Sequence, residues 1–212
     1  HWSIMARVYL DYATTTPLDR GVIREMKRCW RTDFGNPGSI HTEGERAKKL
    51  LDKSRDDIAR VLGAHKDELF FTGSGTEANN VALLGFIEGR IAKGAKYSEL
   101  HIITSVIEHS SVLEPIRHLE KKGVAVSYIG VGEDGTVDMK AFKNALRPET
   151  VLVSVMYVNN EIGTIQPIAE ISKAIRNFRK SNNFNEKQPI FFHSDMSQAP
   201  LYLQVRLERL GV

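Results

Sequence analysis

The sequence predicts an α/β fold with a mostly parallel sheet flanked by helices, preceded by an N-terminal helical segment. First, short apolar segments alternate with segments whose apolar residues recur at helical spacing. Second, residues 151–158 are almost continuously apolar, as is typical of a strand buried on both faces. Third, 212 residues with 42% hydrophobic content suffice for one large α/β domain or two small ones.

The N-terminal segment contains two predicted helices. The first follows Pro17, which suits a first helical turn, and its apolar residues recur at helical spacing: Val22, Ile23, Met26 and Trp30. The turn-forming residues 35–39 end it. A second helix is predicted up to Leu62, where Gly63 ends it.

Strands and helices are then predicted in alternation. The strands are expected at residues 68–71, 101–104, 124–129, 151–158 and 189–192. The helices are expected at residues 81–91, 111–120, 139–146 and 168–178. The polar stretch 180–188 is the one expected loop insertion.

Composition argues against several classes of function. The net charge is +3 and the basic residues nearly balance the acidic ones, so we expect no nucleic-acid partner. No apolar run is long enough to span a membrane, and no signal peptide is recognisable. The single cysteine, Cys29, can form neither an internal disulfide nor a cysteine-rich metal site, which favours a reducing, cytoplasmic location.

Polar residues follow four of the predicted strands. They are residues 72–76, 108–109, 159–161 and 195–198. In open parallel sheets ligands bind beyond the carboxyl ends of the strands, so these four groups should converge on one edge.

The glycine-rich turn is the candidate phosphate site. Gly73 and Gly75 allow close approach to the backbone, the following helix offers free N–H groups, and Thr76 adds a hydroxyl. A plain tight turn between strand and helix is the alternative. The turn matches neither nucleotide-binding glycine pattern, which disfavours nucleotides.

The other polar residues each have a functional and a structural interpretation. Asp195 could pair with the pyridinium nitrogen of pyridoxal phosphate (PLP), or it could cap a helix or form a salt bridge. His109 could stack on a flat ring, or it could cap the following helix. Asn160 and Gln198 could bind a ring hydroxyl, or they could satisfy the backbone of their loops. Together with the glycine-rich turn they supply a phosphate site, a ring-stacking group, donors to a ring oxygen and a carboxylate.

Six motifs then resemble one family in its own order. They are residues 10–17, 34–39, 71–80, 108–109, 158–163 and 193–199. They are similar to the motifs of cysteine desulfurases and selenocysteine lyases, which are class V, fold-type I PLP enzymes. The resemblance covers the chain after Met5. It implies an N-terminal arm at residues 1–15 and, at residues 16–212, an incomplete PLP-binding large domain.

The resemblance implies a role for each matching residue. Gly75 and Thr76 would bind the phosphate of PLP. His109 would stack on the pyridine ring and could act as an acid or base. Asp195 would keep the ring nitrogen protonated, and Gln198 would bond the ring hydroxyl.

Two asparagines are implied to lie near the substrate. Asn160 would lie near the ring oxygen and the substrate carboxylate, and Asn36 would lie near the substrate. The implied reaction removes sulfur from L-cysteine, which gives L-alanine and a persulfide for iron–sulfur cluster or thio-cofactor assembly. The resemblance also implies a homodimer and a sulfur-acceptor protein. The alternatives are a selenocysteine lyase acting on L-selenocysteine and a truncated, non-catalytic module that binds PLP or dimerises.

Two catalytic parts of the family match no residue of this chain. The lysine that would hold PLP covalently lies in a Ser-x-His-Lys segment, which would follow beyond Val212. The cysteine that would carry the persulfide lies in the distal portion of the family and also matches no residue here. Cys29 lies outside every family motif, so we expect it to be structural. These 212 residues alone are therefore expected to give no desulfurase turnover.

Overall fold

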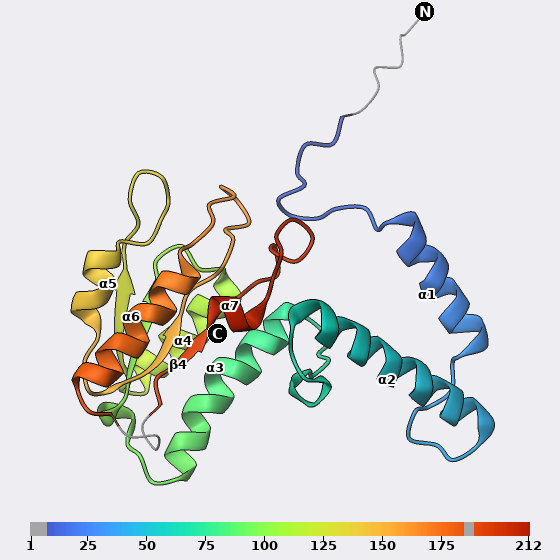
Figure 1. The fold of residues 1–212 in the computed structure, drawn as a ribbon, viewed down its shortest axis with the longest axis horizontal. Helices are drawn as coiled ribbons and strands as arrows, with labels where there is room; N and C mark the ends of the chain where they lie inside the picture. The colour runs from blue at the N-terminus through green and yellow to red at the C-terminus, as the bar shows by residue number, and fades with distance from the viewer. Residues whose placement is uncertain (1–7, 185–188) are drawn as a thin grey trace, which may run out of the picture. The chain divides into compact units, whose positions relative to one another are not determined.

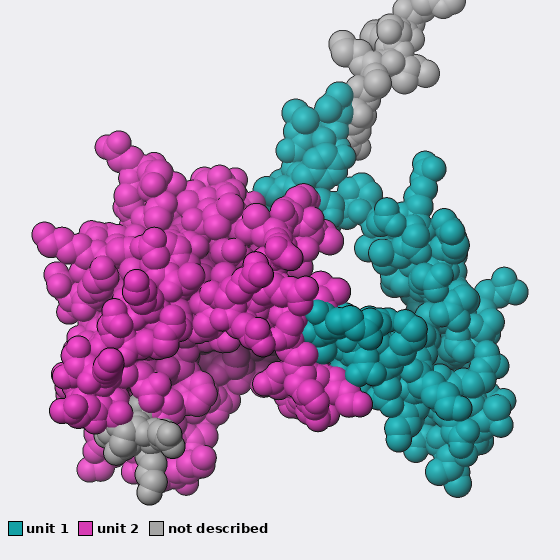
Figure 2. Space-filling view, in the orientation of Figure 1, with its two compact units in different colours: residues 1–60 teal, residues 61–212 magenta. Residues whose placement is uncertain are grey.

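A computed structural model describes residues 8–184 and 189–212. The chain divides into two compact units, residues His1–Arg60 and Val61–Val212 (Figure 2). The expected division into an arm at 1–15 and a large-domain portion at 16–212 stays a prediction, and residues 1–7 lie outside the described part. Within the described ranges no helix combines the length and apolarity needed to cross a bilayer.

The first unit contains the two predicted N-terminal helices. Helix α1 spans Arg20–Thr32 and begins where the Asp19 carboxylate accepts hydrogen bonds from the first-turn N–H groups. Helix α2 spans Thr42–Leu62. Asp33, in the turn between them, pairs with Arg28 at 2.9 Å and with Arg46 at 3.1 Å. Gly35 is required in this turn, because a Cβ there would lie 2.3 Å from the carbonyl oxygen of Glu43.

The second unit contains a four-stranded parallel sheet (Figure 1). Its strands are β1 at His101–Ser105, β2 at Ala125–Ile129, β3 at Thr150–Ser154 and β4 at Phe191–His193. The strand order is β2-β1-β3-β4, so the chain crosses over β1 when it passes from β2 to β3. The predicted α/β class with a parallel sheet is confirmed.

Helices connect the strands of this unit. They are α3 at Gly75–Ala92, α4 at Ser110–Lys121, α5 at Met139–Ala145, α6 at Ile168–Ser181 and the short α7 at Leu207–Leu210. Two 3-10 turns, Lys66–Glu68 and Tyr97–Glu99, precede α3 and β1.

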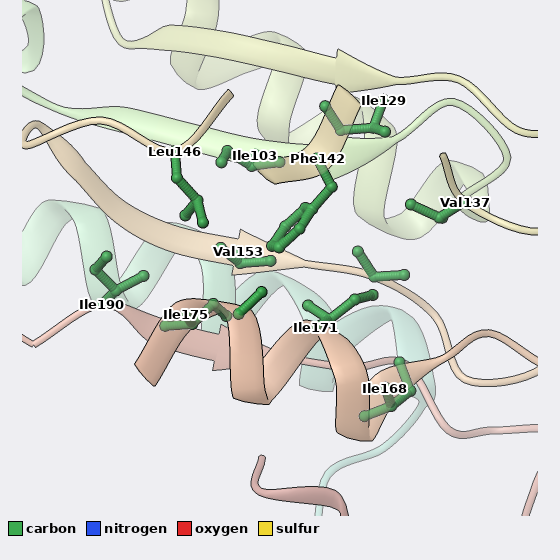
Figure 3. Close-up of a cluster of buried hydrophobic side chains, with 12 residues drawn as sticks. Ile103, Ile129, Val137, Phe142, Leu146, Val153, Ile168, Ile171, Ile175 and Ile190 are labelled. Carbon is green, nitrogen blue, oxygen red and sulfur yellow. The ribbon is translucent and has the colours of Figure 1, made fainter. Parts of the chain in front are cut away.

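The pleat of the strands sorts their side chains between two hydrophobic cores. Ile103 of β1 and Val153 of β3 pack with Phe142 of α5 and Ile171 of α6 (Figure 3). The alternate residues pack on the other face against α3 and α4: Ile102, Leu152, Leu83 and Ile116. Both faces of the central strands are therefore covered, which explains why residues 151–153 are apolar without alternation.

The structure corrects several of the predicted elements. Residues 68–71 were predicted as a strand, but Glu68 ends a 3-10 turn and the segment that follows is not part of the four-stranded sheet. An apolar pattern reports a tendency to be buried, whereas a strand also needs a neighbouring strand, and Phe70 remains 82% exposed. Helix α3 begins at Gly75 rather than at residue 81.

Strand β3 is also shorter than predicted. It ends at Ser154 instead of residue 158. The chain beyond it still runs beside the chain that follows β4, because the N–H groups of Val155 and Tyr157 donate to the carbonyls of His193 and Asp195. In the predicted insertion at 180–188, residues 185–188 lie outside the described part.

Candidate functional site

Polar residues follow the carboxyl ends of three strands, and the charge of Asp195 acts on Glu108. Glu108 and His109 follow β1, residues 159–161 follow β3, and Asp195 lies two positions after the last residue of β4. The start of α3 lies beside them, because a Cβ placed on Gly75 would be 3.5 Å from Ser197 Oγ. The predicted convergence of the turn at Gly75 with the residues around Asp195 is therefore seen in the second unit.

The glycine-rich turn caps helix α3 and leaves two backbone N–H donors without a partner in the described residues. Ser74 is the N-cap of α3, and its hydroxyl accepts from the Glu77 N–H at 3.1 Å. The Glu77 carboxylate in turn accepts from the Gly73 N–H at 2.6 Å. A helix leaves its first N–H groups without partners inside the helix, and among the described residues those of Gly75 and Thr76 are the ones open to a ligand.

Asp195 is held by three hydrogen bonds. Its Oδ2 accepts from Asn79 Nδ2 at 2.8 Å. Its Oδ1 accepts from the backbone N–H of Ser197 at 3.0 Å and from the Ser197 hydroxyl at 2.7 Å. A carboxylate has about four acceptor positions, so one position on Oδ2 remains for a further donor.

The same contacts keep Asp195 ionised. Its partial burial alone would raise the pKa of this carboxyl group, but the hydrogen bonds from Ser197 and Asn79, together with nearby His193, outweigh burial and hold the pKa below its usual range. Asp195 therefore presents a negative charge with one open acceptor position.

His109 begins helix α4 as its N-cap. Its Nδ1 accepts from the Ser111 N–H at 3.1 Å and lies 2.8 Å from the Ser111 hydroxyl. The residue is exposed, so one edge of the ring is tied to α4 while the ring remains accessible. The structural interpretation of His109 as a cap is thus seen, and it leaves the ring free to contact a ligand.

Glu108 is the most strongly perturbed acid at this edge of the sheet. Its Oε1 accepts from the Ser105 hydroxyl at 2.5 Å and from the Met156 N–H at 2.9 Å, which joins the ends of β1 and β3. Its Oε2 is buried and has no hydrogen-bond partner in the described residues. Burial raises the pKa of Glu108 to about 7, with a smaller contribution from the charge of Asp195.

The remaining predicted site residues make fewer contacts with the residues around Asp195. Asn160 is half-buried and Gln198 is exposed, and within the described ranges neither side-chain amide bonds to the protein. Asn159, which precedes Asn160, is buried and shapes its turn, since its Oδ1 accepts from the N–H groups of Glu161 and Ile162. Asn36 belongs to the first unit, where its Oδ1 accepts from the Gly38 N–H at 2.9 Å.

Sequence reasoning missed two residues of this site. Asn79, on α3, is 4% exposed, and its side-chain amide contacts both Asp195 and Ser111. Ser111 is buried in the first turn of α4. Both lie in or next to the quoted motifs, but their neighbours in the chain carry no sign that these side chains meet. The helix was predicted to begin at residue 81, so Asn79 was not recognised on the face that buries Leu83 and Ile87, where an amide needs partners.

The arrangement presents complementary groups to a flat, charged molecule. Backbone N–H groups at the start of α3 favour an anion. The ionised Asp195 favours a cationic N–H, and the exposed ring of His109 offers an aromatic surface. Thr76 and Ser111 also line a cavity of about 490 Å³ between α3 and α4.

Known proteins resemble this chain over nearly its whole length. Residues 8–212 match the model of the family described as aminotransferase class-V. The chain is 43% identical over 205 residues to cysteine desulfurase IscS of Dictyoglomus turgidum, which covers 97% of this chain and 48% of that protein. It is 41% identical over 195 residues to putative cysteine desulfurase IscS 1 of Bacillus subtilis, covering 92% of this chain and 48% of that protein.

Solved structures share the fold. A NifS-like protein superposes with a TM-score of 0.85 at 34% identity, covering 97% of this chain and 53% of the other. SspA, solved in complex with cysteine, gives a TM-score of 0.83 at 34% identity, with 96% and 55% covered. The chain spans about half the length of the curated relatives it matches. Because the family model covers nearly all of it, the chain belongs to the aminotransferase class-V family.

Proposed function

We propose that the protein is a PLP-dependent cysteine desulfurase and that these residues supply the non-covalent part of its PLP site. The observation that carries the proposal is the ionised, three-fold hydrogen-bonded Asp195 beside the N-terminus of α3. PLP needs both features, because it carries an anionic phosphate at one end and a ring nitrogen that an Asp keeps protonated. The expected division, with residues 16–212 in the PLP-binding domain, is part of this proposal.

The donor set fits PLP. The N–H groups of Gly75 and Thr76 would bind the phosphate together with the Thr76 hydroxyl. The open acceptor position on Asp195 would take the ring N–H. His109 would lie against the ring, and the amides of Gln198 and Asn160 would donate to the ring oxygen. When bound, PLP supplies an electron-withdrawing ring that stabilises negative charge on the substrate carbon.

The chain's own residues then have separable tasks. Asp195 would hold the proton on the ring nitrogen of bound PLP, because its lowered pKa keeps it ionised at neutral pH. Asn160 and Asn36 are proposed to contact the substrate carboxylate and the substrate. The lysine that holds PLP and the cysteine that receives the sulfur match no residue here, so we propose that residues outside these 212 provide them.

The substrate class follows from the relatives. Those described above are named cysteine desulfurases, and SspA was solved with cysteine. We therefore propose L-cysteine as substrate, a persulfide passed to an acceptor protein as product, and a homodimer in a reducing compartment. L-Selenocysteine is the alternative substrate.

The test compares Asp195→Asn with wild type in the full-length protein. Pyridoxine 5′-phosphate lacks the aldehyde of PLP, so its binding measures only the non-covalent contacts. Asp195→Asn should weaken its binding by about 30-fold in calorimetry, since a hydrogen bond to a charged group is lost. Alanine release from L-cysteine should fall in parallel. Glu133→Gln, an exposed acidic residue, is the matched control and should behave as wild type.

Three results would contradict the proposal. One is equal binding by wild type and Asp195→Asn, and another is the absence of binding by wild type. The third is alanine release from L-selenocysteine with none from L-cysteine, which would assign the alternative substrate. The 212-residue chain alone should release no more alanine than free PLP does, because Cys29 is its single cysteine and lies outside the family motifs.

A further inference from the structure

One chain of hydrogen bonds connects His109 to Asp195 through two residues with no assigned role. Asn79 Nδ2 donates to Asp195 Oδ2 at 2.8 Å and to Ser111 Oγ at 2.9 Å. Ser111 Oγ lies 2.8 Å from His109 Nδ1. The four residues come from α3, from the start of α4 and from the segment after β4. We call His109, Ser111, Asn79 and Asp195 the relay.

The direction of every hydrogen bond in the relay is determined. The ionised Asp195 can only accept, so the nitrogen of the Asn79 amide must face it, and both N–H bonds of that amide are used. Ser111 Oγ accepts one of them. Its single O–H then donates to His109 Nδ1, because that nitrogen also accepts the Ser111 backbone N–H and so carries no proton.

The tautomer of His109 follows from the same contacts. Its Nδ1 also accepts the backbone N–H of Ser111 at 3.1 Å, so the two Ser111 donors share the one lone pair of this nitrogen. A nitrogen that accepts a backbone N–H bond carries no proton, so the proton of the neutral ring lies on Nε2. The Nε2–H group is therefore the donor that the accessible edge of His109 offers.

We propose that Asn79 and Ser111 are positioning residues that hold His109 as its Nε2–H tautomer and fix the Asp195 carboxylate through the same hydrogen-bond chain. The two proposed contacts to the PLP ring, from His109 and from Asp195, then act as one unit. This inference rests on the proposed function only in so far as His109 and Asp195 contact PLP.

The burial of the connecting residues supports this role. Asn79 is 4% exposed and Ser111 is 8% exposed, so water does not replace their hydrogen bonds easily. A buried amide with a purely structural role could bond to any polar group. The Asn79 amide instead donates both N–H bonds to side chains of the candidate site. Removing either connecting residue should therefore change both ends of the relay.

The first experiment needs no PLP. The full-length apoprotein is labelled with 15N-histidine, and the His109 signals are assigned with His109→Gln. Wild type should show the Nε2–H tautomer. In Asn79→Ala and Ser111→Ala the nitrogen shifts should move towards the mixture of tautomers of a free ring, while the exposed control Asn144→Ala leaves them unchanged. An Nδ1–H tautomer in wild type, or unchanged shifts in both relay variants, would overturn the inference.

The second experiment measures coupling through binding of pyridoxine 5′-phosphate. Asn79→Ala should weaken binding by about tenfold, because it frees the charged carboxylate. The double variant with Ser111→Ala should bind about as weakly as Asn79→Ala alone, since residues that act as one chain are not additive. Ser111→Thr keeps the hydroxyl and should restore the shifts and the binding of wild type.

The outcomes separate the two proposals. Losses that add in the double variant would show independent contacts and overturn the relay. If wild type does not bind pyridoxine 5′-phosphate, the proposed function fails, and the nitrogen shifts of the apoprotein still decide the relay. Circular dichroism on every variant verifies that the fold is retained.

Discussion

His101 and Glu108 are buried ionisable residues at opposite ends of β1, and their surroundings differ in one respect. Both ring nitrogens of His101 have partners, since Nδ1 lies 2.8 Å from Thr150 Oγ1 and Nε2 lies 2.9 Å from Ser127 Oγ. Glu108 has one oxygen with two donors and one buried oxygen with none. His101 therefore has a partner for each ring nitrogen, whereas Glu108 keeps an acceptor oxygen without one among the described residues.

This difference separates a structural group from a functional region. A polar group that is fully paired inside the fold contributes to stability and has nothing left to offer a ligand. Unfilled positions collect at the carboxyl ends, on Glu108 and on Asp195. Ligand sites of open parallel sheets lie at this edge for the same reason, because strands stop there and the loops supply donors and acceptors without completing them.

The largest expected effect concerns the pH dependence contributed by Glu108. Its pKa is about 7 in the fold and 4.5 in the unfolded chain, so between these values the folded protein keeps a proton that the unfolded chain has lost. The contribution of this group is full below pH 4.5 and is lost as the pH rises to about 7. The shift corresponds to about 3 kcal/mol of unfolding free energy.

Glu108→Gln removes this titration. The stability of the variant relative to wild type should increase by about 3 kcal/mol between pH 4.5 and 7. Urea unfolding of both proteins across this range measures it, with Glu133→Gln as the exposed control. A constant difference across the range would show that Glu108 is ionised in the fold and that the two ends of β1 do not differ in this way.

His101 should show the opposite dependence. Burial lowers its pKa from 6.5 to about 4, with a smaller effect from Arg147. Its contribution is present above pH 6.5 and is lost as the pH falls towards 4, again by about 3 kcal/mol. His101→Gln replaces the ring by an uncharged amide. The stability of the variant should lie below that of wild type at neutral pH, and this difference should shrink by about 3 kcal/mol as the pH falls towards 4.

The two titrations nearly cancel in wild type between pH 4.5 and 6.5, because one stabilises the fold on acidification while the other destabilises it. Each single variant should therefore reveal the slope that the other residue hides. If Glu108→Gln and His101→Gln show slopes of the same sign, the contrast between the two ends of the strand is wrong.

The smallest effect is expected at Gly75, where the functional end can be changed with little structural cost. An added Cβ would meet Ser197 Oγ at 3.5 Å, which is an ordinary contact, so Gly75→Ala should change stability by less than about 0.5 kcal/mol. The same methyl group lies where we propose the phosphate approaches the backbone. Binding of pyridoxine 5′-phosphate should weaken by roughly threefold. Gly85→Ala, mid-helix in α3 with open space around its Cβ, is the control for the added methyl.

Much of the fold followed from local patterns. The alternation of apolar segments predicted four strands that the structure contains, and the helical spacing predicted helices α1 to α6, because both depend on side chains close together in the chain. The short helix α7 was not predicted. The prediction of a strand at 68–71 was wrong, because a strand needs a neighbouring strand to pair with and its own residues cannot supply one. The predicted start of α3 was too late, because the first turn of this helix contains glycine and polar residues. Ser74 is recognisable as the N-cap once the helix is known.

The sequence by itself determined the family, the parallel α/β class and the residues proposed to contact PLP, because motifs and periodicity are properties of the chain order. Only the tertiary structure decided what holds those residues. Asn79 and Asp195 lie 116 positions apart, yet their side chains are 2.8 Å from each other. Glu108 is a carboxylate like many others until β1 and β3 bring Ser105 and the Met156 N–H to one of its oxygens and leave the other buried. Burial and pairing across distant segments set charge states and tautomers, and no local pattern encodes them.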